Sequence, residues 1–441
     1  MGDRLDDDVF GTGCQQLTEP VIRGMGESAV SQKRFGPLHG TIVLDLSQGV
    51  AGPFCTKLLA DFGARVIKIE PPTGDPARNM GPFPDDSADP ERSGMYLHLN
   101  VNKEGAAIDL AHPEGADLIR RLAQRVDVLI ESFAPGRLGS SGLGPVDLIA
   151  ANPRLVVTSI TPFGQSGPYR DWEMTDIVAF AMGGAMSVSG SPAREPVKLA
   201  GDGANLMYCG ATACVATLGA LYHSKAVGSG QHVDVATYET QNGSLDRRRY
   251  NLLSNQYSGV IGLRGLTIGA GQPTVGGRLE SSDGRFITAG SIWPEHVPRM
   301  IETIDDPELN ELWKEEPDGG AFIANHGPAI REALVRWAAG RPARQAMHEA
   351  QTNRWPVVVV NDPLTLLDDV HLEARGFWVD APHPIAGTLR YSRSPIRSTP
   401  DRWSLRRTAP TLGQDTDAVL TDLLGLDEED LAALRAKQVV Q

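Results

Sequence analysis

Short apolar runs alternate along the chain with segments of helical periodicity. The first run, Ile42–Leu46, predicts a strand, Pro53–Phe62 a short helix, and Arg65–Ile69 a second strand. Two further apolar runs, Val126–Ile130 and Leu155–Ile160, predict buried strands. This alternation predicts an α/β fold with a parallel sheet covered by helices on both faces. Ligands are then expected at the carboxyl ends of the strands.

The pattern changes after a predicted strand at Gln231–Thr237. A Gly-rich stretch follows, then a strand at Phe286–Gly290 and helical segments between residues 295 and 350, which together indicate a smaller α+β domain. A strand at Trp355–Asn361 and an amphipathic terminal helix are expected to return to the large domain. The predicted units are an N-terminal extension (1–37), the first part of a large domain (38–230), a linker and small domain (231–350), and the return to the large domain (351–441).

Composition narrows the class of protein. The 441 residues carry a net charge of −14, from 41 basic and 55 acidic residues, which argues against a nucleic acid or an anionic membrane as partner. Four scattered cysteines form no metal or disulfide pattern, and the first residues are too acidic for a signal peptide, so we expect a cytoplasmic protein. The apolar run Cys209–Tyr222 is shorter than the roughly 18 residues that span a bilayer and predicts a buried helix.

The first candidate for chemistry is the turn Ser47–Pro53, which joins a predicted strand to a helix. Its backbone N–H groups could bind a phosphate, or its glycines could simply let the helix pack close to the sheet. Nearby, Lys68 and a loop with Asn102 and Lys103 form a sparse basic set in an acidic chain. Because Lys68 lies near a strand end beside the glycine turn, we expect these residues to contact a diphosphate.

The second candidate is Asp202, which stands between Gly201 and Gly203 and before a long predicted helix of small residues, Ala204–Tyr222. An Asp at this place is commonly a helix N-cap. It could equally be a nucleophile, since N–H groups at a helix start keep a carboxylate ionised and glycines leave room for a bulky thioester. Neighbouring amides could also stabilise an oxyanion.

Several segments in the same order resemble the class III CoA-transferase family, which includes formyl-CoA transferase. They are LDLSQGVAGPFCTKLLADFGARVIKIEPP, LNVNKEGAAIDL, VDVLIESFAPG, the Asp202 segment and APTLGQDTDAVLTDLLGL, so the likeness covers nearly everything after residue 38. The resemblance implies a Rossmann-like large domain, a small domain, and a homodimer whose two subunits interlock like links of a chain.

The resemblance also implies a reaction. Asp202 would attack an acyl-CoA thioester to give a mixed anhydride, and the CoA thiolate would convert this to an aspartyl-CoA thioester that an acceptor acid then takes up. The substrates would be an acyl-CoA and a free carboxylic acid, with the coenzyme A thioester as substrate, no permanently bound cofactor and no metal. The implied CoA and flap residues are Gln48, Val50, Ala51, Ile108, Ser132, Phe133, Asp176, Gly269, Gly271 and Gln272.

Two other functions stay open. Related α-methylacyl-CoA racemases use the His of a Gly-His-Asp segment as a second acid/base, whereas this chain has Met174-Thr175-Asp176. Because Thr175 cannot serve as that base, the sequence favours a transferase over a racemase or epimerase. The other alternative is a non-catalytic CoA-binding protein in which Asp202 only caps a helix. The chain also departs from the family at Glu104, Pro71 and Ser140, where relatives often have Arg, so its phosphate contacts are expected to differ.

Overall fold

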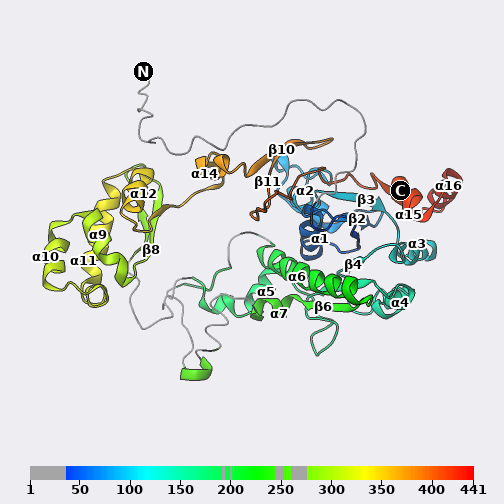
Figure 1. Ribbon diagram of the computed structural model, residues 1–441, viewed down its shortest axis with the longest axis horizontal. Helices are drawn as coiled ribbons and strands as arrows, with labels where there is room; N and C mark the ends of the chain where they lie inside the picture. Colours follow the sequence, from blue (N-terminus) through cyan, green and yellow to red (C-terminus); the bar gives the residue numbers. More distant parts are fainter. Residues whose placement is uncertain are drawn as a thin grey trace, which may run out of the picture.

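A six-stranded sheet forms the centre of the larger unit, on the right in Figure 1. The computed structural model describes residues 36–190, 194–198, 201, 203–243, 253, 255–259 and 276–441. The strand order is β3-β2-β1-β4-β5-β6, and all five neighbouring pairs are parallel. This confirms the predicted α/β class. The strands are β1 (Ile42–Asp45), β2 (Arg65–Glu70), β3 (Lys103–Ala107), β4 (Val128–Glu131), β5 (Val156–Thr161) and β6 (His232–Ala236).

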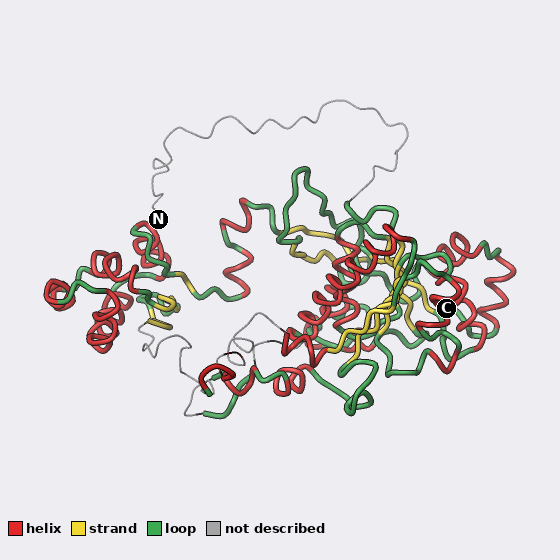
Figure 2. Tube along the Cα trace, turned by 60° about the horizontal axis from the view of Figure 1, so that its bottom comes forward, coloured by secondary structure: helices red, strands yellow, loops and turns green. Residues whose placement is uncertain are grey.

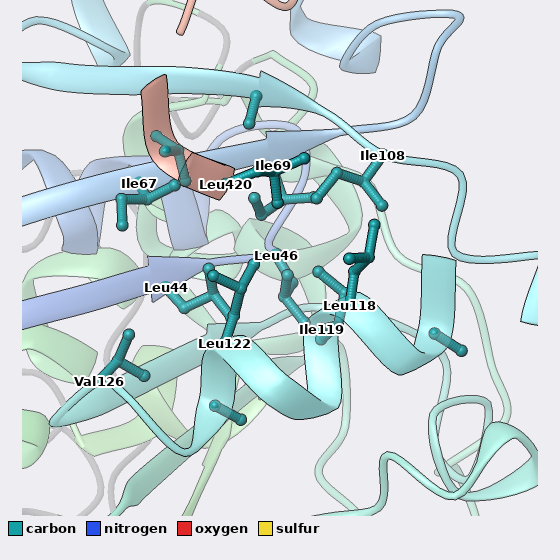
Figure 3. Packing of buried hydrophobic residues seen from close by; sticks show 14 of the residues in the cluster. Leu44, Leu46, Ile67, Ile69, Ile108, Leu118, Ile119, Leu122, Val126 and Leu420 are labelled. Atoms are coloured by element: carbon teal, nitrogen blue, oxygen red, sulfur yellow. The ribbon is translucent and has the colours of Figure 1, made fainter. Parts of the chain in front are cut away.

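Both faces of this sheet are covered because its strands are apolar on both sides. Along β1, Val43 and Leu44 point to opposite faces and belong to two separate core clusters. Figure 3 shows the Leu44 side, where side chains from β1, β2 and α3 meet Leu420 near the C-terminus. The helices on that side are α3 (Pro113–Ala123), α4 (Pro145–Ala151), α15 (Thr416–Leu424) and α16 (Glu428–Ala436). Those on the Val43 side are α1 (Ala51–Asp61) and α6 (Ala204–Val227).

The chain leaves the centre of the sheet in two directions. It runs from β1 outward to β3 on one side and from β4 outward to β6 on the other. In doubly wound sheets, ligands bind where this order reverses, at the carboxyl ends of the two central strands. The remaining elements around this sheet are η1 (Pro76–Asn79), η2 (Pro84–Asp86), α2 (Gly94–Leu99), η3 (Gly139–Ser141), α5 (Asp176–Met182), η4 (Ala185–Val188) and α7 (Thr237–Gly243).

A smaller unit with its own core lies apart from the large sheet in both views (Figures 1 and 2). Its antiparallel sheet includes β9, so the segment after residue 351 still belongs to this unit, while β6 extends the large sheet past residue 230. Both predicted boundaries therefore shift. The unit comprises β7 (Gly276–Glu280), β8 (Phe286–Ser291), η5 (Pro294–His296), α9 (Val297–Ile304), α10 (Pro307–Glu315), α11 (Gly319–Ala339), α12 (Ala343–Thr352) and β9 (Val358–Val359).

The chain returns to the large sheet through two short helices and a hairpin. These are α13 (Pro363–Leu367), α14 (Val370–Ala374), β10 (Trp378–His383) and β11 (Gly387–Ser392). Ala386 and Leu389 of the hairpin pack against a small cluster that includes Tyr96 of α2. The C-terminal helices then pack into the core of the large domain through Val419 and Leu431.

Helix α6 is the one described helix whose length and composition would allow it to cross a membrane. It packs instead against α1, and Gly210 makes this approach possible, because a Cβ at that position would lie 2.3 Å from the carbonyl oxygen of Ala51. The predicted helix is therefore confirmed, but only one of its faces is buried, and Val215 and Tyr222 are exposed. The contact also fixes the N-terminal half of α6 against the start of α1.

Helix α2 carries a histidine that should make stability depend on pH. Burial, with Lys57 nearby, lowers the pKa of His98 from 6.5 to about 4. The unfolded chain therefore binds a proton that the folded chain does not take up, so stability falls as the pH drops from 6.5 toward 4, by about 3 kcal/mol in all. We expect His98→Gln to flatten the pH dependence of thermal unfolding between pH 7 and 4.5. The exposed His371→Gln is the control, and an unchanged profile for His98→Gln would contradict the assignment.

Candidate functional site

The turn after β1 is held by side chains from two other strand ends. The N–H of Gln48 donates to Ser132 Oγ at 2.8 Å, and the N–H of Gly49 donates to Asp75 Oδ1 at 3.0 Å. Gly49 has a φ of +76°, in the left-handed region that favours glycine. The structure thus brings Gln48 and Ser132 together, as the sequence analysis expected of a shared site. The same bonds occupy two of the N–H groups that we expected to face a phosphate.

Lys68 lies directly beneath this turn and is completely buried. Its ammonium group donates to Asp75 Oδ2 at 2.6 Å and to the carbonyl oxygen of Ser47. Burial favours the neutral amine, but Asp75, with Asp45 next, outweighs it and raises the pKa of Lys68. In this structure Lys68 supports the turn from below, and its predicted contact with a diphosphate stays a prediction.

Lys103 is not on a loop, as the sequence analysis placed it, but is the first residue of β3. The segment KEGAA lacks an apolar run, so its strand could not be recognised from the pattern. The ammonium group of Lys103 is fully buried and donates to Asn100 Oδ1 at 2.8 Å, the carbonyl oxygen of Pro53 at 2.9 Å and Asp45 Oδ2 at 3.1 Å. Burial lowers the pKa of Lys103 to about 8, although Asp45 acts in the opposite direction.

Asn102, the third member of the predicted basic set, connects the large sheet to the returning chain. It has a φ of +64°, and its side chain donates to Asp61 Oδ1 at 2.8 Å and to the carbonyl oxygen of Ser404 at 3.1 Å. Its Oδ1 accepts the N–H of Arg406 at 2.7 Å. These bonds fix the entry to β3 and leave the side chain only 5% exposed.

Sequence reasoning missed the carboxylates that hold these lysines. Asp75 also accepts the N–H of Ala77 at 2.8 Å and so caps η1, with Pro76 at its first position. The Asp-Pro pair was a usable signal for a helix start. The pairing of Asp75 with Lys68 could not be predicted from the sequence, because it depends on how the loop after β2 folds back over the strand.

Three more predicted residues lie around the turn. Val50 and Ala51 begin α1, with Val50 buried and Ala51 partly exposed. Ile108 is completely buried and points into the core in Figure 3, and its N–H donates to the carbonyl oxygen of Glu70 at 2.9 Å. Phe133 is partly buried, and its N–H donates to Glu131 Oε2 at 2.7 Å.

The start of α6 lies against this turn. Gly201 and Gly203 both have positive φ angles, of 84° and 90°. A Cβ at Gly203 would lie 3.3 Å from Val50 Cγ1 and 3.7 Å from Met95 Cε. Asp202 between them lies outside the described residues, as do the predicted flap residues Gly269, Gly271 and Gln272. The backbone on both sides of position 202 therefore adopts conformations that favour glycine, next to the predicted CoA residue Val50.

Asp176, at the first position of α5, caps helix α6. Its Oδ1 accepts the N–H groups of Asn205 at 3.0 Å and Leu206 at 3.3 Å, and its Oδ2 lies 3.1 Å from Lys198 Nζ. The N-cap residue itself is Gly203, which has no side chain to accept a bond. Asp176 thus contacts Lys198 before position 202 and Asn205 after it. It caps the helix, which is the role that the alternative interpretation gave to Asp202.

Removing this cap should disturb the neighbouring segment. We expect Asp176→Ala to lower stability by about 1–2 kcal/mol, since two N–H groups at the start of a helix lose their acceptor. Any activity that depends on the neighbouring Asp202 should fall about tenfold with it, because misplacement of a reacting group is costly. Asp176→Asn keeps an acceptor oxygen and should lie between the wild type and Asp176→Ala in both thermal unfolding and rate. Equal losses in the two variants would contradict a capping role.

No group of three or more His, Cys, Asp or Glu side chains suited to a metal occurs within the described ranges. The site instead combines a turn, an aromatic side chain and a glycine-flanked helix start at the switch point of a parallel sheet. Such an arrangement can bind an extended anionic ligand along the strand ends and present it to the start of α6.

Known proteins are similar to this chain in sequence and in fold. The model of CoA-transferase family III matches residues 38–416. Succinyl-CoA–D-citramalate CoA-transferase of Chloroflexus aurantiacus is 33% identical, over 93% of this chain and 100% of that protein. Succinate–glutarate CoA-transferase of Agrobacterium fabrum is 33% identical, over 88% of this chain and 96% of that protein. The crystal structure of a CAIB/BAIF family protein from Brucella suis, 28% identical, matches with a TM-score of 0.76 over 88% of this chain and 100% of that one. The chain belongs to CoA-transferase family III.

Proposed function

We propose that this enzyme transfers CoA from succinyl-CoA to a second short dicarboxylic acid. The proposal rests on one arrangement. The turn in which Gln48 bonds to Ser132 lies at the switch point of the sheet, and its next residue but one, Val50, lies against Gly203, which follows Asp202 in the sequence. The choice of acids rests on relatives, because those named above use succinate or succinyl-CoA with citramalate or glutarate. Thr175 in place of a second acid/base favours transfer over racemisation.

In the proposed mechanism Asp202 is the nucleophile. Its carboxylate adds to the thioester carbonyl, the C–S bond breaks, and CoA departs as the thiolate. The product on the enzyme is a mixed anhydride between Asp202 and the donor acid. The thiolate then attacks the Asp202 carbonyl carbon, and the donor leaves as a carboxylate. The acceptor carboxylate repeats both steps in reverse. The N–H groups of Asn205 and Leu206 donate to Asp176. A neighbouring N–H group at this helix start is suited to stabilise the oxyanion.

The direct test is an exchange assay. The protein is incubated with succinyl-CoA and a panel of mono- and dicarboxylic acids, and new acyl-CoA species are measured by mass spectrometry. We expect transfer to short dicarboxylic acids and little to monocarboxylic acids. A protein that binds CoA but forms no new thioester would instead be a non-catalytic binder. Exchange of the α-hydrogen of a 2-methylacyl-CoA for deuterium, without transfer, would establish a racemase.

We also propose that the chain is a cytoplasmic homodimer whose subunits interlock. The described cysteines are buried free thiols, as expected in a reducing compartment. Helix α6 exposes an apolar row in which Tyr208, Val215 and Tyr222 are 42%, 71% and 79% exposed. An exposed apolar row of this kind is typical of an interaction surface, and a second copy is the partner that the family resemblance implies.

This row gives a test of the dimer. We expect Val215→Asp combined with Tyr222→Asp to convert a dimer into a monomer, because two carboxylates would lose hydration in the interface. Sedimentation velocity measures the change. Val146→Asp, at an 81% exposed position on α4, is the matched control and should stay dimeric. A wild type that is monomeric at micromolar concentration would overturn the proposal.

A further inference from the structure

Both lysines that the sequence analysis assigned to the CoA site lie inside the protein in this structure. Lys68 and Lys103 are fully buried, and each is paired with a carboxylate. CoA carries a diphosphate and a 3′-phosphate, and in a chain of net charge −14 these groups need a local positive charge. The cation must therefore be another side chain near Gln48 and Ser132.

Arg137 meets this requirement. It is exposed on the loop that follows β4, five residues after Ser132. Across the described part of the chain, the contact of its guanidinium is with the ring of Phe133, whose centroid lies 5.4 Å away, and it has no hydrogen bond or ion pair. Arg78, by contrast, is buried and paired with Glu70. An unpaired guanidinium beside the switch point is available to an anionic ligand.

The loop is shaped so that Arg137 returns over Phe133. The N–H of Arg137 donates to the carbonyl oxygen of Ala134 at 3.0 Å, which closes a turn, and Gly136 within it has a φ of +86°. Phe133 packs against the core below it. An aromatic support of this kind limits the freedom of the guanidinium, so less entropy is lost when a ligand binds.

A second guanidinium approaches the same turn. A Cβ at Gly136 would lie 3.9 Å from Nη2 of Arg170, on the loop after the neighbouring strand β5. Arg170 is paired with the exposed Asp171 at 3.1 Å. Two guanidinium groups, those of Arg137 and Arg170, thus lie near the same turn.

We propose that Arg137, supported by Phe133, binds a phosphate group of coenzyme A and so determines the affinity of the enzyme for CoA thioesters. The inference rests on the proposed function for its substrate. Its chemistry is that of a guanidinium donating two N–H groups to a phosphate, which applies equally to the diphosphate and the 3′-phosphate. Arg137 takes no part in bond making, so its loss acts on binding and not on the chemical step.

The test compares Arg137→Ala with the wild type on three thioesters: succinyl-CoA, succinyl-dephospho-CoA and succinyl-pantetheine. We expect the KM for succinyl-CoA to rise about 10- to 100-fold while kcat and the KM for the acceptor acid stay unchanged. If Arg137→Ala raises the KM for succinyl-CoA but not for succinyl-dephospho-CoA, Arg137 binds the 3′-phosphate. If it raises the KM for both of these but not for succinyl-pantetheine, Arg137 binds the diphosphate. An equal loss on all three thioesters, or none, overturns the proposal.

Two controls keep this result separate from other causes. Arg344→Ala removes an exposed arginine of the small domain and should leave all three KM values unchanged. Binding of CoA and of pantetheine by calorimetry needs no turnover. If the wild type binds CoA without transferring it, the proposed function fails, while a Kd raised by Arg137→Ala for CoA and not for pantetheine still supports the role of Arg137. A Kd for CoA that Arg137→Ala does not change overturns it.

Discussion

Asp202→Asn should lower the rate of CoA transfer by about 10⁴-fold while the affinity for CoA changes little. The amide has the size of the carboxylate but cannot add to a thioester, so no mixed anhydride forms and the whole covalent route is lost. The glycines on both sides, with φ angles of 84° and 90°, tolerate either side chain, and the capping of α6 by Asp176 is independent of this position. A loss of rate without a loss of stability is therefore the expected signature.

The covalent intermediate provides the second readout. Hydroxylamine added during turnover should convert the aspartyl thioester to a hydroxamate, which peptide mass spectrometry would locate at Asp202. Asp171→Asn, at an exposed carboxylate of the same domain, is the matched control and should keep full activity and the adduct. An adduct on another carboxylate, or an Asp202→Asn variant that still transfers CoA at the normal rate, would remove Asp202 from the mechanism.

The sheet could be predicted from the sequence because its strands are short apolar runs between recognisable helices. The predicted runs at residues 42–46, 65–69 and 155–160 correspond to β1, β2 and β5 within one residue at each end. Strand β3 could not be recognised, since KEGAA carries Lys and Glu where a buried strand is normally apolar. Its burial depends on Asp45, which lies 58 residues earlier and neutralises Lys103.

The candidate site divides in the same way. Motifs along one segment, such as the turn at Gln48 and the glycines beside position 202, could be read directly from the sequence. Contacts between distant segments could not be predicted. Asp176 caps a helix that begins 28 residues later, and the role proposed for Arg137 depends on the burial of Lys68 and Lys103. Local sequence specifies turns and helix starts, whereas the pairing of charges depends on the assembled fold.

Substitution within the buried Lys103–Asp45 pair should destabilise the large domain strongly. Lys103→Met keeps the volume of the side chain but removes the ion-pair partner of the fully buried Asp45, and it also leaves Asn100 Oδ1 without its donor. Breaking a buried pair in this way costs about 3–5 kcal/mol. We expect the large-domain transition in calorimetry to fall by several degrees, while the separate core of the small domain is unaffected.

The double variant Asp45→Asn, Lys103→Met separates the charge from the packing. Because no unpaired charge remains, it should recover a large part of the stability that Lys103→Met loses, and this recovery measures the coupling between the two side chains. Lys314→Met, which breaks an exposed pair with Glu311 on α10, should change stability very little. If Lys103→Met were as stable as the wild type, or if the double variant were less stable than Lys103→Met, Asp45 and Lys103 would not form the ion pair that joins β1 to β3 beneath the site.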